Sequence, residues 1–225
     1  MPKLLKFKEE NEGNTIDIQH LLKQKKGQLI IKRLFDFIVS LFGILILLPL
    51  LLVLAIIIKL DSGGPVFFKQ VRVGKEGTEF KIFKFRTMEV DAEKKGMQIT
   101  VGKDKRITKS GHILRHSKLD ELPQLINVLK GDMSFVGPRP EVPKYVALYN
   151  EYQKNILKVR PGITDLASIE YRDENTLLAK SKDPEDTYTK EIMPKKIELN
   201  IEYLKNMSVF YDIKLILKTI LVILR

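Results

Sequence analysis

The amino-acid sequence predicts a helix-rich α+β protein that is attached to a membrane. Three observations support this fold class. Residues 37–58 form an apolar run without a charge, and residues 66–73 and 80–87 are two β-rich runs separated by a turn. Apolar residues also recur at helical spacing after residue 120 and again near the C-terminus. The chain has 225 residues, which is enough for one ordinary domain but short for two.

The composition limits the kinds of site that the protein can have. The formal net charge is +11 at pH 7, and this basic surplus indicates an anionic partner such as nucleic acid, anionic lipid or a phosphorylated small molecule. The chain has no cysteine, which excludes disulfides and thiolate metal sites. Its three histidines are scattered without the spacing of a zinc site, so a histidine-based mechanism is not expected.

A charged cytoplasmic leader is expected at residues 1–30, followed by a membrane segment at residues 31–60. The uncharged run at 37–58 would measure about 33 Å as a straight helix, close to the thickness of a hydrocarbon core. No small-residue cleavage pattern of a signal peptide follows it. The alternative is a helix buried in the core of a soluble domain, but such helices are usually shorter.

The topology of this segment stays open on sequence physics alone. Lys32 and Arg33 precede the run and Lys59 follows it, so positive charges draw both ends toward the cytoplasm. Pro49 lies near the middle, where it removes one backbone hydrogen bond and bends the helix. A bent helix can return to the side from which it came, whereas a spanning helix tolerates the proline with a kink. The residues are equally compatible with both topologies.

We expect residues 61–225 to form a cytoplasmic domain. The two β-rich runs on either side of "GKEG" predict a β-hairpin near 66–87. Its second strand carries Lys81, Lys84 and Arg86, which form either a solvated face or a phosphate-binding surface. Residues 88–111 are charged and contain glycine, which predicts an excursion over the surface.

The second half of the domain is expected to combine helices with two rigid loops. A helix is predicted from Asp120 to the stop signal at Gly131. The sequence "VGPRPEVP" predicts a loop that holds Arg139 in one place, and "KVRPGIT" predicts a second turn of this kind at Arg160. Residues 209–225 predict an amphipathic helix at the membrane interface, with a core-facing helix as the alternative.

The paired acids Asp120 and Glu121 have two interpretations. At a helix start, acids cap free N–H groups and complement the helix dipole. The nearby Arg86, Arg115 and Arg139 and the membrane segment favour chemistry on a phosphate at a membrane instead. One carboxylate would then hold Mg²⁺ together with diphosphate oxygens, which leaves the other free to attack phosphorus.

The stretches "KLDSGGPVFFKQVRVGKEGTEFKIFKFRTM", "LDELPQLINVLKGDMSFVGPRP" and "VRPGIT" closely resemble the bacterial polyprenyl-phosphate sugar-1-phosphate transferases, the monotopic phosphoglycosyl transferases. The similarity runs from about Lys32 to the C-terminus. It implies a re-entrant membrane helix bent at Pro49, in the bacterial inner membrane, with the catalytic domain on the cytoplasmic face. The chain departs from the family pattern at Leu48, where a Ser or Thr is common, and at residues 165–168, which lead toward the sugar-recognition region.

The resemblance also implies a reaction. Asp120 would attack the β-phosphorus of a UDP-sugar, release UMP and carry the sugar phosphate to undecaprenyl phosphate, while Glu121 would bind Mg²⁺. The substrate-binding residues would be Lys84, Arg86, Arg115, Arg139, Arg160 and Asp212. Partners would be the UDP-sugar donor, the polyprenyl phosphate acceptor and membrane lipid, without nucleic acid, and the sequence leaves a homodimer open. The competing function is a non-catalytic basic protein that binds the membrane or nucleic acid.

Overall fold

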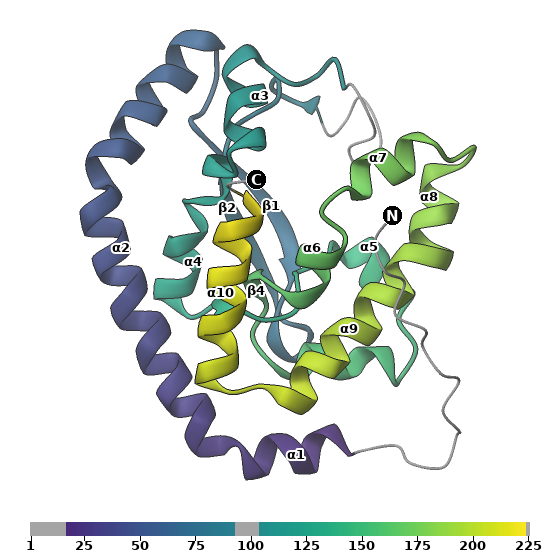
Figure 1. The fold of residues 1–225 in the computed structure, drawn as a ribbon. Coiled ribbons are helices and arrows are strands. Elements are labelled where there is room, and N and C mark those ends of the chain that lie inside the picture. The colour runs from purple at the N-terminus through teal and green to yellow at the C-terminus, as the bar shows by residue number, and fades with distance from the viewer. Residues whose placement is uncertain (1–16, 93–103, 224–225) are drawn as a thin grey trace.

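The computed structural model describes residues 17–92 and 104–223, and Figure 1 shows how their elements are arranged. The strands are β1 (Phe67–Val73), β2 (Glu79–Phe85), β3 (Ser134–Val136) and β4 (Gly162–Thr164). The α-helices are α1 (Ile18–Gln24), α2 (Lys26–Asp61), α3 (Lys109–His116), α4 (Gln124–Lys130), α5 (Pro143–Val146), α6 (Leu166–Glu170), α7 (Glu174–Ala179), α8 (Pro184–Thr187), α9 (Met193–Asn206) and α10 (Val209–Ile223). Short turns of other helix types are η1 (Lys75–Gly77), η3 (Leu119–Glu121), η4 (Gln153–Lys158) and η5 (Tyr188–Ile192). The fold is helix-rich with a small hairpin, as predicted, and it contains a second small sheet of β3 and β4 that was not predicted.

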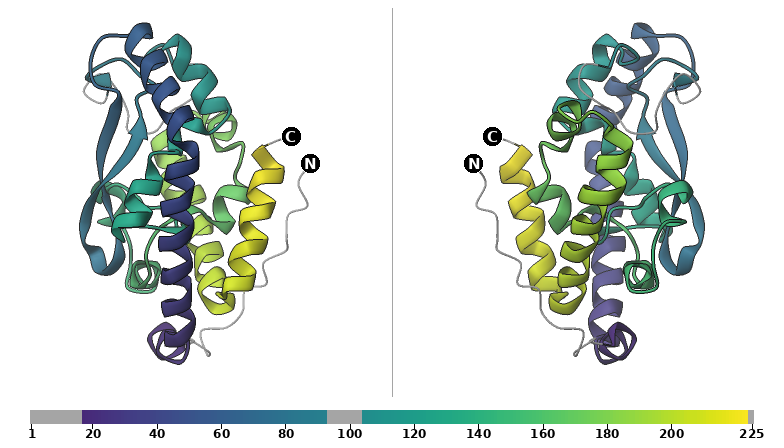
Figure 2. Two further views of the ribbon diagram at one scale, coloured as in Figure 1. Left: turned by 90° about the vertical axis from the view of Figure 1, so that its left-hand side faces the viewer. Right: turned by 90° about the vertical axis from the view of Figure 1, so that its right-hand side faces the viewer.

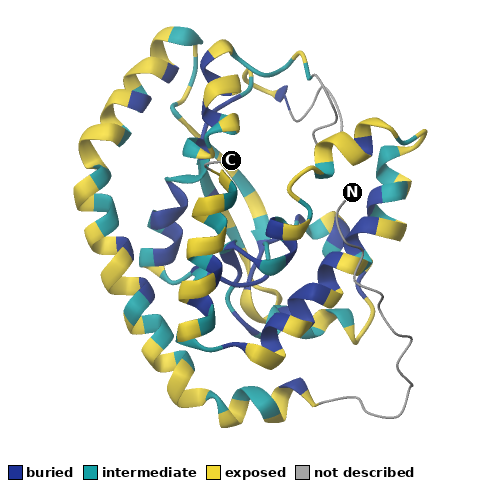
Figure 3. Cartoon of the chain, in the orientation of Figure 1, coloured by how far each residue is buried: buried dark blue, intermediate teal, exposed yellow. Residues whose placement is uncertain are grey.

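The helix α2 runs along one side of the molecule over its whole height (Figures 1 and 2). It is 36 residues long, continues through Pro49 and is curved. It is long and apolar enough to cross a membrane, and only 11% of its most apolar stretch of 18 residues is buried. Figure 3 shows the exposed residues along its outer face. A core helix would be covered, so this alternative is wrong, and the re-entrant bend stays a prediction.

Polar side chains attach both ends of α2 to the rest of the protein. Near its start, Arg33 donates to two carbonyl oxygens at the end of α4, at 2.6 and 2.9 Å. One turn further, Asp36 accepts a hydrogen bond of 3.1 Å from a backbone N–H of β3. At the far end, Asp61 accepts from the backbone N–H and the hydroxyl of Ser110 in α3, at 2.9 and 2.8 Å. Both ends of α2 therefore bind the same folded body.

The predicted β-hairpin is confirmed. The strands β1 and β2 pair antiparallel from Phe67 opposite Phe85 to Val73 opposite Glu79. The turn between them contains η1, in which Glu76 has a φ of 54° and Gly77 a φ of 75°. Glycine adopts this left-handed region without the steric cost that other residues meet, which explains the "GKEG" signal.

The helix α4 is fixed to this hairpin by one fully buried amide. Asn127 donates through Nδ2 to the carbonyl oxygen of Lys81 at 2.9 Å and accepts at Oδ1 from the backbone N–H of Phe83 at 2.9 Å. The amide of Asn127 thus forms with β2 the hydrogen bonds that a neighbouring strand would form with its backbone. They place the start of α4 beside Lys84, the next residue of β2.

The two proline-containing loops pass each other at van der Waals distance. The strands β3 and β4 pair parallel, so the second predicted Arg-Pro turn continues into a strand. Just beyond β3, Gly137 lies against Gly162. A Cβ added to Gly162 would be only 2.2 Å from the backbone nitrogen of Gly137. Gly162 also donates its N–H to the carbonyl oxygen of Pro138 at 3.0 Å. This contact holds the loop that carries Arg139.

The C-terminal helix is confirmed as α10. Its inner face buries Asp212 and Leu215, and its outer face exposes apolar side chains, among them Phe210 and Leu221. Its position at a membrane interface stays a prediction. The helix α1 lies within the leader predicted at residues 1–30, and residues 1–16 lie outside the described part of the chain. In the predicted excursion at 88–111, the last three residues already belong to α3, and residues 93–103 are not described.

Candidate active site

The paired acids lie in a tight turn between α3 and α4. Lys118 has a φ of 58°, and this left-handed residue separates α3 from the short 3₁₀ helix η3, which holds Asp120 and Glu121. Pro123 then precedes the first residue of α4. The prediction that Asp120 begins the long helix is wrong by about one turn, because Leu119–Glu121 form a separate 3₁₀ turn and α4 begins only at Gln124.

Glu121 forms the centre of a partly buried ion cluster. Its Oε1 accepts hydrogen bonds from Nζ of Lys84 at 2.8 Å and from Nη2 of Arg139 at 2.7 Å. Burial alone would raise the pKa of Glu121, but Arg139 and Lys84 together lower it well below its usual value. The charge of Glu121 in turn raises the pKa of Arg139. Glu121 is therefore ionised and holds two cations beside its neighbour in the chain.

Asp120 lies in a different environment from Glu121. It is 8% exposed, and its Oδ1 is buried without a hydrogen-bond partner in the described part of the chain. Burial raises the pKa of Asp120, the positive charge of Lys84 opposes this rise, and the negative charge of Glu121 adds to it. A capping acid would accept backbone N–H groups at the helix start, but the start of η3 has no side-chain cap. Asp120 therefore makes no capping hydrogen bond at η3 or α4, and its predicted effect on the helix dipole stays a prediction.

An unpaired carboxylate oxygen in a buried position is costly for folding. Such groups are rare in native proteins, and each one calls for a separate reason, such as a catalytic role or a missing ligand. The positive charges of Lys84, Arg115 and Lys118 act on Asp120, a setting that suits an acid that meets a phosphate.

Of the other predicted site residues, only Arg115 acts on the acid pair. Arg115 comes from α3, and its positive charge is among those that oppose the effect of burial on the pKa of Asp120. Arg86 is buried and donates to the carbonyl oxygens of Ser62 and Pro65 at 2.8 and 2.6 Å. These bonds tie the end of α2 to the start of β1.

Arg160 and Asp212 make their contacts elsewhere. Arg160 donates through Nε to the carbonyl oxygen of Gly131 at 2.8 Å. Asp212 accepts from Nζ of Lys32 at 2.5 Å and from the hydroxyl of Tyr203 at 2.7 Å, and so it joins α10 to α2 and α9. The structure thus brings Lys84, Arg115 and Arg139 to the acids, whereas the hydrogen bonds of Arg86, Arg160 and Asp212 described above join other partners.

Two amides near the site were missed in the sequence. Gln124 is 1% exposed and its Nε2 has no partner among the described residues. Asn127 connects α4 to the hairpin, as described above. Both occupy buried positions of a helix that was identified from its apolar pattern. The sequence signal for Gln124 and Asn127 was that each is a polar residue on the helix face where the pattern predicts apolar residues.

The acid pair fits Mg²⁺ only together with a substrate. Within residues 17–92 and 104–223, no group of three or more His, Cys, Asp or Glu side chains could hold a metal by itself. Mg²⁺ commonly takes one or two carboxylates and completes its shell with water and phosphate oxygens. Glu121 is ionised and uses Oε1 for Lys84 and Arg139, so the donor set is compatible with a metal that arrives with a diphosphate.

Comparison with known proteins identifies the family. Residues 27–225 match the family described as "Bacterial sugar transferase". A UDP-N-acetylgalactosamine-undecaprenyl-phosphate N-acetylgalactosaminephosphotransferase of Aeromonas hydrophila is 38% identical over 226 residues, which cover 96% of this chain and 50% of that protein. A UDP-glucose:undecaprenyl-phosphate glucose-1-phosphate transferase of Escherichia coli is 38% identical over 195 residues, which cover 85% and 39%.

Other relatives are of similar length to this chain. An exopolysaccharide production protein of Rhizobium leguminosarum is 40% identical over 201 residues, which cover 85% of this chain and 94% of that protein. The chain therefore spans half or less of the first two relatives and corresponds to nearly the whole of the third. The match over residues 27–225 includes the turn of Asp120 and Glu121, all of α10 and all but the first residue of α2. The chain belongs to the bacterial sugar transferase family.

Proposed function

We propose that the protein transfers a sugar 1-phosphate from a UDP-sugar to a polyprenyl phosphate, such as undecaprenyl phosphate, through a covalent intermediate on Asp120. One observation carries this proposal: Oδ1 of Asp120 is buried without a hydrogen-bond partner in the described chain, beside Glu121 and its two cations. The names of the relatives support this reaction class. One of them uses UDP-N-acetylgalactosamine and another uses UDP-glucose, so the sugar is left to experiment.

The first half of the reaction would begin with an ionised oxygen of Asp120. This oxygen attacks the β-phosphorus of the donor, the bond from that phosphorus to the bridging oxygen breaks, and UMP leaves with the bridging oxygen. The sugar phosphate is then bound to Asp120. In the second half, a phosphate oxygen of the polyprenyl phosphate attacks the same phosphorus, and Asp120 is released as a carboxylate. No oxidant or reductant is required.

The neighbours of Asp120 would each contribute to this step. Lys84 favours the ionised form of Asp120, which burial disfavours. Arg139 presents a guanidinium group whose further N–H groups can bind phosphate oxygens as negative charge moves toward UMP. Mg²⁺ held by Glu121 would offset the charge of the diphosphate.

We also propose that α2 is re-entrant, on the cytoplasmic face of the bacterial inner membrane. The attachment of both its ends to the same body supports this topology, because Arg33 binds α4 and Asp61 binds α3. A spanning helix would place these two attachments on opposite sides of the bilayer. The exposed apolar residues Phe210, Leu217 and Leu221 of α10 would lie at the same membrane surface.

The test is release of UMP by the purified protein in detergent, with Mg²⁺, undecaprenyl phosphate and a panel of UDP-sugars. One donor should give turnover, and removal of Mg²⁺ should stop it. Asp120→Asn should lower the rate by about 1,000-fold or more, as expected for the loss of a nucleophile. The exposed Asp173 provides a matched control, and Asp173→Asn should stay within about twofold of the wild type.

Two results would contradict the proposal. Turnover by Asp120→Asn at the rate of the control would rule out Asp120 as the nucleophile. An absence of UMP release with all donors, together with membrane binding that weakens steeply with salt, would favour the competing non-catalytic function.

A further inference from the structure

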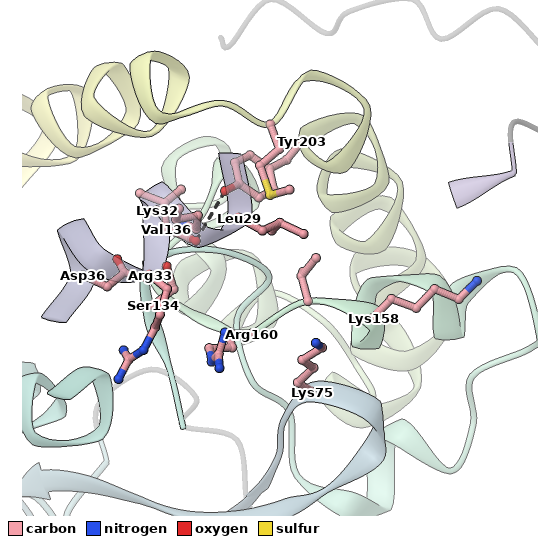
Figure 4. Close-up of a pocket in the computed structure, with 12 residues that line it drawn as sticks. Leu29, Lys32, Arg33, Asp36, Lys75, Ser134, Val136, Lys158, Arg160 and Tyr203 are labelled. Atoms are coloured by element: carbon pink, nitrogen blue, oxygen red, sulfur yellow. Dashed lines mark hydrogen bonds between the residues drawn. The ribbon is translucent and has the colours of Figure 1, made fainter. Parts of the chain in front are cut away.

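A pocket lies between the start of α2, the hairpin turn and the loop before β4 (Figure 4). Five of its twelve lining residues are basic and one, Asp36, is acidic. The acid pair and its cations Lys84 and Arg139 are not among the residues that line it. The pocket is therefore separate from the candidate active site and requires its own explanation.

Several of the positive charges in this pocket lack a compensating acid. Lys32 is paired with Asp212. Arg33 has no such acid among the described residues, because its two hydrogen bonds go to neutral carbonyl oxygens of α4. Arg160 likewise donates to a neutral carbonyl oxygen, that of Gly131. Burial and the nearby charge of Arg33 lower the pKa of Arg160, and Asp36 only partly opposes them. The positive charges of Arg33 and Arg160 therefore repel each other in a partly desolvated place.

The hairpin turn adds a third cation to this group. Figure 4 shows Lys75 on the far side of Arg160 from Arg33, while the ammonium group of Lys158 points away from all three. The three side chains come from α2, from η1 and from the loop before β4. A pocket assembled from three distant segments, with a net positive lining, is suited to an anion.

A buried hydroxyl provides a second, independent observation. Ser134 is 1% exposed, lines this pocket, and its Oγ has no hydrogen-bond partner in the described part of the chain. Buried hydroxyl groups almost always have a partner. An anion bound between Arg33 and Arg160 would accept the hydrogen bond that Ser134 does not make within the protein.

We propose that this pocket binds the phosphate group of an anionic membrane lipid. Guanidinium groups bind phosphate through paired N–H donors, and Arg33 and Arg160 supply two of them. Arg33 and Asp36 occupy the turns of α2 directly before the uncharged run at residues 37–58. The pocket thus lies where α2 meets the level of the lipid headgroups. This inference does not depend on the chemistry at Asp120.

The test uses the full chain in neutral detergent micelles, with hydrogen exchange read by mass spectrometry. Three probes are compared: dihexanoyl phosphatidylglycerol, dihexanoyl phosphatidylcholine and inorganic phosphate. Phosphatidylglycerol should slow exchange in residues 73–77 and 157–161, which flank the pocket. Phosphatidylcholine, whose headgroup has no net charge, should have little effect, and inorganic phosphate should act only at higher concentration.

Variants then tie the effect to the pocket. Ser134→Ala keeps the backbone hydrogen bond from Ser134 to Pro161 and should weaken binding about tenfold, the expected effect of one lost hydrogen bond to a charged group. Arg160→Gln should weaken binding at least as much, and the exposed Lys75→Gln by a smaller factor. Lys180→Gln removes an equal charge from an exposed site at the end of α7 and should change nothing.

The outcomes are distinct. Protection by phosphatidylglycerol that Ser134→Ala weakens and Lys180→Gln does not would support the proposal. Equal binding of inorganic phosphate and phosphatidylglycerol would keep the anion site but overturn its assignment to a lipid. Equal protection by phosphatidylcholine would overturn the assignment to an anionic lipid. The same affinity in Ser134→Ala and Lys180→Gln would overturn the site itself.

Discussion

Asp120 and Glu121 are adjacent in the chain and both are acidic, yet the fold treats them in opposite ways. The cations Lys84 and Arg139 both bind Oε1 of Glu121, and they keep the pKa of Glu121 low in spite of burial. Oδ1 of Asp120 has no such partner in the described chain, and burial raises its pKa. Two neighbouring groups with opposite shifts are typical of a site that assigns them different roles.

The unpaired carboxylate predicts a gain in stability when it is removed. In metal-free buffer near neutral pH, Asp120→Asn should raise the free energy of unfolding by about 1 kcal/mol, because a buried charge without a partner is replaced by a neutral amide. Thermal unfolding in detergent measures this change. Asp173→Asn is the control and should leave the melting temperature unchanged.

The pH dependence of this gain follows from the direction of the shift. Because the folded pKa of Asp120 is raised above its usual value of 3.8, the penalty is absent below that value and develops as pH rises through the folded pKa. The advantage of Asp120→Asn should therefore be small in acid and largest near neutral pH. If the stability gain of Asp120→Asn became smaller as pH rises, the ionised carboxylate of Asp120 would not be the destabilising group.

The position of the acid turn depends on how α4 is attached to the hairpin. Asn127→Ala should lower the free energy of unfolding by about 2–4 kcal/mol, because the N–H of Phe83 and the carbonyl oxygen of Lys81 would be buried without partners. Denaturant unfolding measures this loss. The control is Asn155→Ala. The amide of Asn155 donates to the carbonyl oxygen of Tyr152 in an exposed turn, and its removal should change the free energy of unfolding by no more than about 0.5 kcal/mol. Equal effects of the two variants would show that Asn127 does not join the two elements.

The elements with strong local signals could be predicted from the sequence. Alternation of apolar residues around "GKEG" predicts the hairpin, and the amphipathic run after Val209 predicts α10. The start of α4 was misplaced, because the periodic pattern continues back to Leu122 and does not show that Leu119–Glu121 form a separate 3₁₀ turn. The short parallel pair of β3 and β4 was not predicted, since three-residue strands have no pattern of their own.

Partnerships between distant residues were harder to predict than the elements. The sequence places Lys84 and Arg139 near the acids only through the resemblance to a family, and the structure supplies their contacts with Glu121. Nothing in the sequence indicated that Arg160 would lie with Lys75 and Arg33, which are 85 and 127 residues earlier in the chain. Such clusters depend on tertiary packing and have no local signature.

At the scale of the whole molecule, the attachment of both ends of α2 to one body leads to a topology test. The chain has no cysteine, and an added Cβ at Gly27 or Gly63 would meet no atom within 4 Å. Gly27→Cys and Gly63→Cys therefore mark the two ends of α2 with little disturbance. A membrane-impermeant maleimide should label both variants in inverted inner-membrane vesicles and neither in intact spheroplasts. Labelling of the two ends from opposite sides would show that α2 spans the bilayer.

The central claim is that Asp120 bonds to phosphorus during the reaction, and peptide mass spectrometry after a short incubation tests it most directly. The wild-type protein is mixed with Mg²⁺ and its UDP-sugar, without the acceptor, and quenched before digestion. The account predicts a mass increase of one sugar phosphate on the peptide of η3, with fragment ions that assign it to Asp120, and no increase in Asp120→Asn. An adduct on Glu121 or on any other residue, or the same adduct in Asp120→Asn, would contradict it.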